Sequence, residues 1–227
     1  MVVEVLNDAD SVAAKAAAVI AVEARSAISE RGRFVMAVSG GHTPWVMLKA
    51  LSVEDLPWHS VIFVQVDERI APAGDPDRNL THLRESLIGA PLNPEQIYAM
   101  PVEALNPLAA ASQYSKTLER IAGAPIVLDL VHLGLGPDGH TASLIPNDPV
   151  LEVTDRDVAL TGVYQGRNRM TLTYPVINRA RRILWVVTGS EKVLALGQLR
   201  NGDISIPAGR IRREESLLLA DRAAAGQ

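Results

Sequence analysis

Residues 34–44 have the sequence Phe-Val-Met-Ala-Val-Ser-Gly-Gly-His-Thr-Pro, and this stretch decides the fold class. The unbroken apolar run Phe34–Val38 predicts a strand that is buried on both faces, because no polar residue alternates with the apolar ones. The two glycines that follow indicate a tight turn. Thr43 suits the N-cap of a helix and Pro44 its first position. A strand, a glycine turn and a helix in this order form the repeating unit of a parallel α/β sheet.

The same order recurs along the chain. We predict further strands at Val2–Leu6, Val61–Val66, Leu128–Leu135, Met170–Thr173 and Ile183–Thr188. Helical patterns separate most of them: one runs from Asp8 or Asp10 to near Gly32, and others span residues 44–51, 79–88, 107–121 and 191–199. The expected fold is therefore a single α/β domain over residues 1–227, with a Rossmann-like, mostly parallel sheet and helices on both faces.

Composition excludes several classes of protein. The 227 residues are 48% hydrophobic, which is enough for a large core, and the net charge of -4 comes without a basic stripe. Nucleic acid is therefore not an expected partner. The absence of cysteine excludes disulfides and thiol nucleophiles. Met1–Asp10 does not have the pattern of a signal peptide, and Ala13–Ala27 is too polar to span a membrane. We expect a cytoplasmic protein without a membrane partner; the oligomeric state stays open.

Four predicted strands end in polar clusters: Ser39–Thr43, Asp67–Arg69, Gly136–Thr141 and Thr188–Lys192. The carboxyl ends of parallel strands share one edge of the sheet, where open α/β sheets bind ligands. A single polar, glycine-rich loop is explained by the need to turn. Four such loops that bring Asp, Arg, His and Lys to one edge favour an active site.

The first two clusters suit an anion. The backbone N–H groups of Ser39-Gly40-Gly41 and the following helix N-terminus would cradle phosphate, although a plain tight turn explains the same residues. In the second cluster, Asp67 and Arg69 share one side of an extended segment and Glu68 points to the other. Arg69 could grip a phosphate or carboxylate with two hydrogen bonds, or pair with Asp67 to stiffen the loop.

The third cluster carries the candidate base. His140 lies at the opening of a predicted helix. Histidine as a residue type can take a proton from water near neutral pH, and Asp138 could orient the ring. Capping the helix or binding phosphate are the other roles open to His140. A second Gly-His-Thr contains His42, and the residues alone leave the choice open, although Asp138 favours His140. No further ligands at suitable spacing indicate a metal site.

Two other nucleophile and base candidates are less favoured. His132 lies inside a predicted strand and is expected to be a core histidine. A serine nucleophile would need a Gly-x-Ser-x-Gly turn, which neither Ser39 nor Ser143 provides.

These motifs, taken together and in order, resemble the 6-phosphogluconolactonases, a family grouped with the glucosamine-6-phosphate deaminases. The resemblance covers nearly the whole chain. It is carried by Ser39-Gly40-Gly41 with Thr43-Pro44, Val66-Asp67-Glu68-Arg69, Asp75-Pro76-Asp77 leading to Asn79, the stretch Leu133–Leu144, Arg169-Met170-Thr171-Leu172-Thr173, and Val187-Thr188-Gly189 with Lys192.

The resemblance implies a cofactor-free hydrolase of the oxidative pentose phosphate pathway that opens 6-phospho-D-glucono-1,5-lactone to 6-phosphogluconate. It implies that His140 activates water and that Asp67 and Asp138 form its polar surroundings. The implied phosphate and substrate clamp consists of Arg69, Arg169, Lys192 and the loop Ser39-Gly40-Gly41. Arg167 is the alternative to Arg169, because the segment before Arg169 lacks the prolines usual in the family.

Two alternatives remain beside the lactonase. Deaminase-type relatives usually carry an aromatic residue where this chain has Arg69, and an acid after the histidine motif, where this chain has Leu144-Ile145-Pro146. Ring opening with loss of an amine would need that acid. A non-catalytic sugar-phosphate-binding protein would usually carry a partner-binding or DNA-binding module, which the sequence does not indicate. The chain also departs from the family at His42 and at Gly209, where small polar residues are frequent.

Overall fold

A seven-stranded sheet forms the centre of the computed structural model, which describes residues 1–227. The strand order is β1-β10-β9-β6-β2-β3-β5, and every neighbouring pair is parallel. The strands are β1 (Val2–Leu6), β2 (Phe34–Val38), β3 (Val61–Gln65), β5 (Ile97–Tyr98), β6 (Leu130–Leu133), β9 (Arg182–Val187) and β10 (Ser216–Asp221). The predicted α/β class with a mostly parallel sheet is confirmed.

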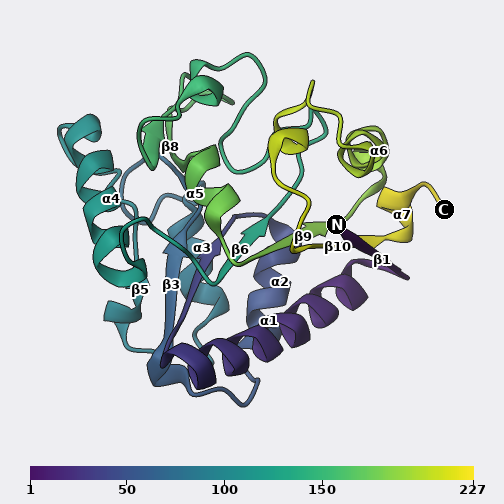
Figure 1. Cartoon of the computed structure of the whole chain (residues 1–227), viewed down its shortest axis with the longest axis horizontal. Helices are drawn as coiled ribbons and strands as arrows, with labels where there is room; N and C mark the ends of the chain where they lie inside the picture. The colour runs from purple at the N-terminus through teal and green to yellow at the C-terminus, as the bar shows by residue number, and fades with distance from the viewer.

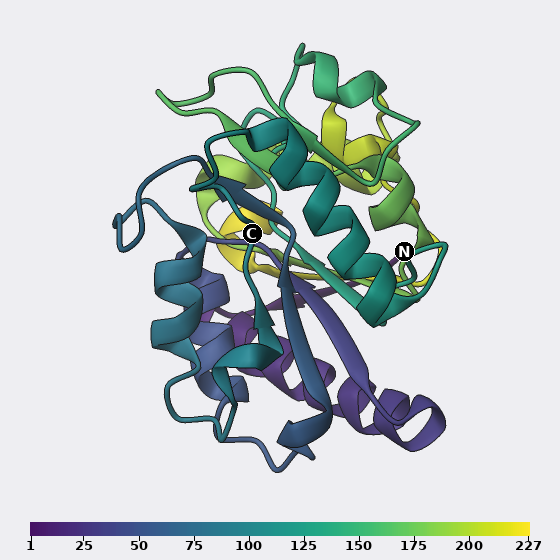
Figure 2. The same cartoon turned by 90° about the vertical axis from the view of Figure 1, so that its left-hand side faces the viewer.

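Helices cover both faces of this sheet, as predicted (Figures 1 and 2). On one face lie α1 (Ala9–Arg31), α2 (His42–Leu51) and α3 (Asn79–Ser86); on the other lie α4 (Pro107–Ala122), α5 (Tyr174–Arg179) and α6 (Val193–Asn201), with the short α7 (Arg222–Ala225) beside α6. Each face has its own apolar core. In β6, Val131 and Leu133 contribute to one core and Leu130 to the other, as the alternation of side chains along a strand requires.

The first helix shows how local signals set the element bounds. Asp8 is the N-cap of α1 and accepts a hydrogen bond from the Ser11 backbone N–H at 2.7 Å. Gly32 ends the helix in the left-handed conformation, with φ of 75°. Both ends were predictable from the sequence, because these two residue types satisfy the free backbone groups at helix termini.

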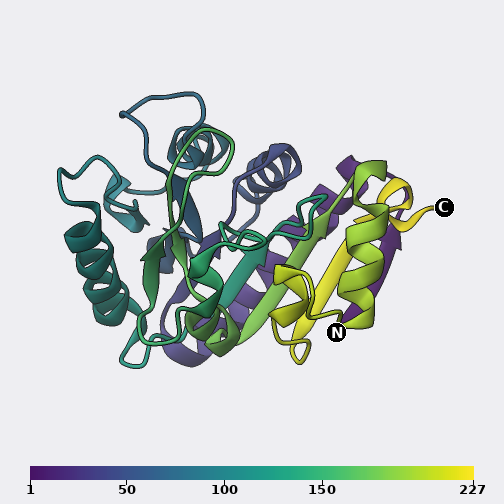
Figure 3. The same ribbon diagram turned by 90° about the horizontal axis from the view of Figure 1, so that it is seen from above.

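Strand β10 is absent from the sequence prediction, although it lies between β1 and β9. Its sequence, Ser-Leu-Leu-Leu-Ala-Asp, contains no β-branched or aromatic residue, so local propensity does not favour a strand. All six residues are buried, and burial between two partner strands outweighs propensity. Figure 3 shows the yellow C-terminal segment beside the purple N-terminal strand.

A second, antiparallel sheet contradicts two further predictions. It has the order β4-β8-β7, from β4 (Asp67–Arg69), β8 (Arg169–Leu172) and β7 (Val158–Leu160). We predicted Asp67–Arg69 as a loop and Met170–Thr173 as a strand of the main sheet. Both segments instead pair with each other, because the chain leaves the main sheet after Gln65 and Val66.

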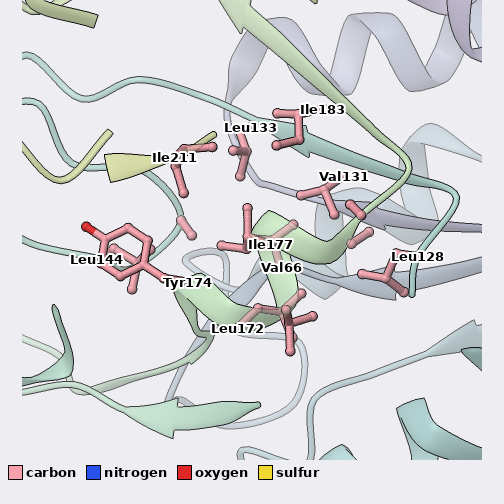
Figure 4. Close-up of a cluster of buried hydrophobic side chains, with 14 of the residues drawn as sticks. Val66, Leu128, Val131, Leu133, Leu144, Leu172, Tyr174, Ile177, Ile183 and Ile211 are labelled. Carbon is pink, nitrogen blue, oxygen red and sulfur yellow. The ribbon is translucent and has the colours of Figure 1, made fainter. Parts of the chain in front are cut away.

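One apolar core joins the two sheets. Figure 4 shows Val131 and Leu133 of β6, Ile183 of β9 and Leu172 of β8 gathered around Ile177 of α5. All five side chains are fully buried. This packing fixes the second sheet, and the residues it carries, against the carboxyl edge of the main sheet. None of the helices has the length and apolar character needed to span a membrane.

Candidate active site

The four polar loops meet in one cleft of about 320 Å³ at the carboxyl edge of the main sheet. The strand ends predict this meeting, because β2, β3, β6 and β9 are neighbours that run in the same direction. The cleft is lined by these predicted site residues: Ser39, Gly40, Gly41, Asp67, Arg69, His140, Arg169 and Lys192. Asp138 and Arg167 are not part of the lining. Asp138 lies behind His140, and Arg167 borders a neighbouring hollow.

His140 closes a tight glycine loop. The Gly136 N–H donates to the His140 carbonyl oxygen at 2.8 Å, and the Gly139 N–H donates to the Gly136 carbonyl oxygen at 3.0 Å. The prediction that His140 opens a helix is wrong. Thr141 and Leu144 instead close a second turn, in which Ala142 has a positive φ of 52° and Leu144 is buried in the core. The left-handed conformation of Ala142 is incompatible with a continuous right-handed helix here.

Two side chains fix the His140 ring. The Asp138 Oδ1 lies 2.6 Å from His140 Nδ1, and the Tyr164 hydroxyl lies 3.0 Å from Asp138 Oδ2. Because a carboxylate accepts hydrogen bonds, Nδ1 carries the ring proton and Nε2 is left as the basic atom. Burial alone would raise the pKa of Asp138, but the charge of His140 and the hydrogen bonds from His140 and Tyr164 lower it overall. Asp138 therefore stays ionised at neutral pH, as a partner of an imidazole base must.

The loop requires glycine at position 136. A Cβ atom there would lie 2.0 Å from His140 Nδ1 and 2.6 Å from Asp138 Oδ1. Any side chain would therefore separate the histidine from its carboxylate.

The first loop differs from its prediction in one detail. Gly41, not Thr43, is the N-cap, and α2 begins at His42. Thr43 instead shares a hydrogen bond of 2.7 Å between its hydroxyl and that of Thr188, which joins the first and fourth loops. The backbone N–H groups of Gly40 and Gly41 donate no hydrogen bond within the protein. They are available to an anion at the helix N-terminus.

Asn79 connects the first loop to β4. Its Nδ2 donates to the Asp67 carbonyl oxygen at 3.0 Å, and its Oδ1 accepts from Arg69 Nη1 at 2.7 Å. A Cβ atom at Gly40 would lie 1.9 Å from Asn79 Oδ1, so only glycine allows this approach. Asp67 also accepts a hydrogen bond of 2.6 Å from the Ser143 hydroxyl. Asp67 and Arg69 thus share a side of β4, as predicted, but each bonds Asn79 and they form no ion pair with each other.

Glu68 points away from the cleft, also as predicted, and is fully buried. Its carboxylate accepts from the N–H groups of Arg69, Asn79 and Leu80 at 2.8–2.9 Å and pairs with Arg78 Nε at 3.1 Å. A buried charge that is paired and hydrogen-bonded in this way holds both the start of α3 and β4 in place. Glu68 therefore has a structural role, while its neighbours Asp67 and Arg69 line the cleft.

Three cations line the cleft. Arg69 and Arg169 stand directly opposite each other on the antiparallel strands β4 and β8, and Lys192 comes from the 3-10 turn Ser190–Lys192. Like charges placed opposite each other in a ladder destabilise a sheet. Burial lowers the pKa of Arg169; attraction to Asp67 opposes this shift, and the smaller effect of the Arg69 charge adds to it. An anion between the two guanidinium groups would relieve their repulsion.

The geometry favours Arg169 over Arg167 as a cleft residue. Arg167 donates to Asp77 Oδ2 and to Asp75 Oδ2, both at 3.0 Å, and lies outside the cleft. Arg169 lines the cleft, and its buried Nε has no hydrogen-bond partner within the protein.

His132 is a core histidine, as predicted, and is fully buried. Burial lowers its pKa to about 3, so the ring is neutral. Its Nδ1 accepts from the Ser39 N–H at 3.3 Å, and the Ser39 hydroxyl donates to the His132 carbonyl oxygen at 3.0 Å. His132 therefore holds Ser39 of the first loop by two hydrogen bonds and does not itself line the cleft.

Sequence analysis missed Tyr164 and the role of Asn79. Tyr164 lies in the loop between β7 and β8, far along the chain from Asp138, and belongs to none of the motifs. Asn79 follows Asp75-Pro76-Asp77 and could have been selected as a polar residue at a helix start near Arg69. No group of three or more acidic or histidine side chains is arranged to hold a metal ion.

Known proteins resemble this chain over nearly its whole length. Residues 7–219 match the family described as “Glucosamine-6-phosphate isomerases/6-phosphogluconolactonase”. A 6-phosphogluconolactonase of Nostoc sp. is 35% identical, with 99% of this chain and 96% of the relative covered. One from Synechocystis sp. is 37% identical, with 87% and 84% covered. The crystal structure of 6-phosphogluconolactonase from Thermotoga maritima has a TM-score of 0.85 at 25% identity, with 97% of this chain and 98% of that one covered.

Proposed function

We propose, since the chain belongs to the glucosamine-6-phosphate isomerase/6-phosphogluconolactonase family, that it hydrolyses 6-phospho-D-glucono-1,5-lactone to 6-phosphogluconate, a step of the oxidative pentose phosphate pathway. One observation carries the proposal. A histidine held by a carboxylate faces the same cleft as two opposed arginines and a lysine. A base beside an anion site suits the hydrolysis of a phosphorylated substrate.

The phosphate group binds at the cationic side of the cleft. Arg69, Arg169 and Lys192 supply positive charge there, and the N–H groups of Gly40 and Gly41 supply further donors. Holding the phosphate fixes the other end of the sugar relative to His140, which reduces the entropic barrier of the reaction.

His140 acts as a general base. Its Nε2 takes a proton from water as the water oxygen forms a bond to the lactone carbonyl carbon. The carbonyl oxygen becomes an oxyanion, which neighbouring N–H or cationic groups stabilise. The bond between this carbon and the ring oxygen then breaks, and the ring oxygen takes the proton back from His140. Asp138 stabilises the charged ring during the reaction. Asp67, held by Asn79 and Ser143, completes the polar surroundings.

No observation favours deamination of an amino sugar phosphate. Leu144 and Ile145, which follow the histidine motif, are buried apolar residues, so no carboxylate is offered from this segment. Lactone hydrolysis requires one base, one water and stabilisation of an oxyanion. The cleft supplies His140 as the base and cationic side chains that can stabilise an oxyanion.

Acid release tests the proposed function. Freshly made 6-phosphogluconolactone and the unphosphorylated lactone are compared in a pH-stat, with the spontaneous reaction subtracted. We expect rapid acid release with a strong preference for the phosphorylated substrate. Release at the spontaneous rate would contradict the proposal, and ammonia release from glucosamine 6-phosphate would support a deaminase instead.

A further inference from the structure

The loop between β7 and β8 contains a tight hairpin that borders a hollow next to the cleft. The Tyr164 N–H donates to the Arg167 carbonyl oxygen at 2.9 Å, and the Arg167 N–H donates back at 3.2 Å. Between them, Gln165 and Gly166 have positive φ values of 51° and 80°, the conformation that two-residue hairpin turns prefer. The turn therefore fixes the direction of the Tyr164 backbone.

A pair of ionic contacts attaches this hairpin to another part of the chain. Arg167 Nε donates to Asp77, and its Nη2 donates to Asp75, both at 3.0 Å. These two acids precede α3, so the hairpin tip is tied to the segment that carries Asn79. Arg167 thus has a role in the hairpin that explains its place outside the cleft.

Tyr164 touches three groups of the proposed site. Its hydroxyl donates to Asp138 Oδ2 at 3.0 Å. Its ring meets the His140 ring edge-on, with centroids 5.3 Å apart and an interplanar angle of 66°. The third contact is with Arg169, whose guanidinium carbon lies 4.9 Å from the centroid of the Tyr164 ring, within the range of a cation–π interaction.

We propose that Tyr164 is a positioning residue that couples the base to the phosphate clamp, an inference that rests on the proposed function. Asp138 uses one carboxylate oxygen for His140 and the other for Tyr164. The phenol hydrogen bond holds the carboxylate in the plane that His140 needs. It also draws negative charge toward the phenol and away from the imidazole. The ring meanwhile keeps the Arg169 guanidinium in the cleft.

The surroundings support a protonated phenol. Burial raises the pKa of Tyr164, and its interaction with Asp138 raises it further, so the hydroxyl remains a donor through the working pH range. Asp138 and Tyr164 contact the His140 ring from outside the cleft. Apart from His140, the charged or titratable groups that line the cleft are His42, Asp67, Arg69, Arg169, Glu191 and Lys192. None of these makes a hydrogen bond to the His140 ring. The Tyr164 hydroxyl also lies 3.3 Å from His140 Nδ1, a longer contact than the 2.6 Å between Nδ1 and Asp138 Oδ1, so its removal acts on His140 both directly and through Asp138, with the shorter Asp138 contact the stronger route.

Tyr164→Phe tests the coupling to the base. It removes the hydroxyl and keeps the ring, so Asp138 interacts more strongly with the charged imidazole. We expect the acidic limb of the profile of kcat/KM against pH to move to higher pH by about 0.5 unit, with little change in KM. The His140 ring resonances, followed by NMR without substrate and assigned with His140→Ala, should titrate at correspondingly higher pH.

Tyr164→Leu tests the coupling to the clamp. It also removes the aromatic face, so Arg169 loses its cation–π partner. We expect KM for the phosphorylated lactone to rise about fivefold beyond any change in Tyr164→Phe. Tyr98→Phe is the matched control, because Tyr98 lies on the edge strand β5 and does not line the cleft. It should leave both the pH profile and KM unchanged.

The outcomes separate the two proposals. Wild-type protein that releases acid only at the spontaneous rate would contradict the proposed function. An active wild type whose pH profile and His140 titration are unchanged in Tyr164→Phe would overturn the role of Tyr164. If Tyr164→Leu does not fold, Tyr164→Phe still decides, because it preserves the packing of the ring.

Discussion

The tripeptide Gly-His-Thr occurs twice in this chain, at 41–43 and at 139–141, and its two histidines have different surroundings. His42 is exposed at the first position of α2, and its ring makes no hydrogen bond to the protein. His140 closes a glycine loop, its side chain is 20% exposed, and Asp138 holds its ring. Both line the cleft, so position alone does not distinguish them.

The difference shows that the groups in contact with a histidine, rather than its position in the cleft, decide whether it can act as a base. The ring of His42 has no hydrogen-bond partner that fixes its tautomer or its orientation. The ring of His140 has both fixed by the Asp138 carboxylate, which leaves Nε2 as the basic atom. Four measurements would break or sharpen this comparison, taken here from the largest expected effect to the smallest.

Removal of the two histidines gives the most direct contrast. We expect His140→Ala to lower kcat about 10²–10⁴-fold, because it removes general-base assistance. His42→Ala should lower kcat less than tenfold, since no carboxylate supports its ring. Acid release from the phosphorylated lactone measures both. The reverse order of effects would transfer the role of base to His42.

A methyl group can separate His140 from Asp138 without removing either. Gly136→Ala places a Cβ 2.0 Å from His140 Nδ1, so the ring must move. A displacement on the order of 1 Å costs about 10²-fold in rate, which we expect to see in kcat. Gly197→Ala, in α6, has no atom within 4 Å of the added Cβ and serves as the control. Circular dichroism would verify that both variants fold; normal turnover of Gly136→Ala would contradict the proposed geometry.

The charge of Asp138 is tested by Asp138→Asn. The amide keeps the shape of the side chain and loses the negative charge that stabilises the imidazolium. Because charge-assisted hydrogen bonds are about twice as strong as neutral ones, we expect kcat to fall about tenfold at neutral pH. Since the pKa of Asp138 is lowered, the wild type keeps this charge well below neutrality, so the ratio of the two rates should be constant from pH 7 to pH 8. An unchanged kcat would remove Asp138 from the site.

The smallest expected effect concerns a third histidine, His132, and is a change in the free energy of unfolding rather than in the rate. The folded pKa of His132 is about 3, below the value of about 6.5 in an unfolded chain. Between these values the unfolded state binds the extra proton, so the free energy of unfolding falls as pH drops below 6.5. We expect wild type to lose about 1 kcal/mol more than His132→Asn between pH 7 and pH 5.5.

Urea unfolding of both proteins at the two pH values makes this measurement. The Asn Oδ1 can replace Nδ1 as acceptor for the Ser39 N–H, so the comparison isolates the titration. If the free energy of unfolding falls equally in the two proteins between pH 7 and pH 5.5, His132 takes up its proton in the folded state over the same pH range as in the unfolded chain.

The predictable parts of the molecule are those set by neighbouring residues. The ends of α1 follow from Asp8 and Gly32, and β2 follows from an unbroken apolar run. The convergence of four loops follows from a general property of parallel sheets. In contrast, β10 carries helix-favouring leucines and becomes a strand only through burial between two others.

The site shows the same division. Asp138 stands two residues from His140, so their contact was predictable. Tyr164 reaches Asp138 from another hairpin, and the choice between Arg167 and Arg169 depends on Asp75 and Asp77 far along the chain. Such contacts arise from tertiary packing, which leaves no local pattern in the sequence. The helix expected after His140 is replaced by the turn between Thr141 and Leu144, in which Ala142 has a left-handed conformation that residue type alone does not favour.

The position of β10 has a consequence for synthesis on the ribosome. Strand β1 pairs only with β10, which lies far later in the chain. During synthesis, β1 therefore has no partner strand, and β9 lacks one neighbour, until β10 has been made. Premature termination before residue 216 would leave both edges open to other chains. We expect such fragments to aggregate or to be bound by chaperones, whereas a chain that contains β10 covers these two strand edges itself.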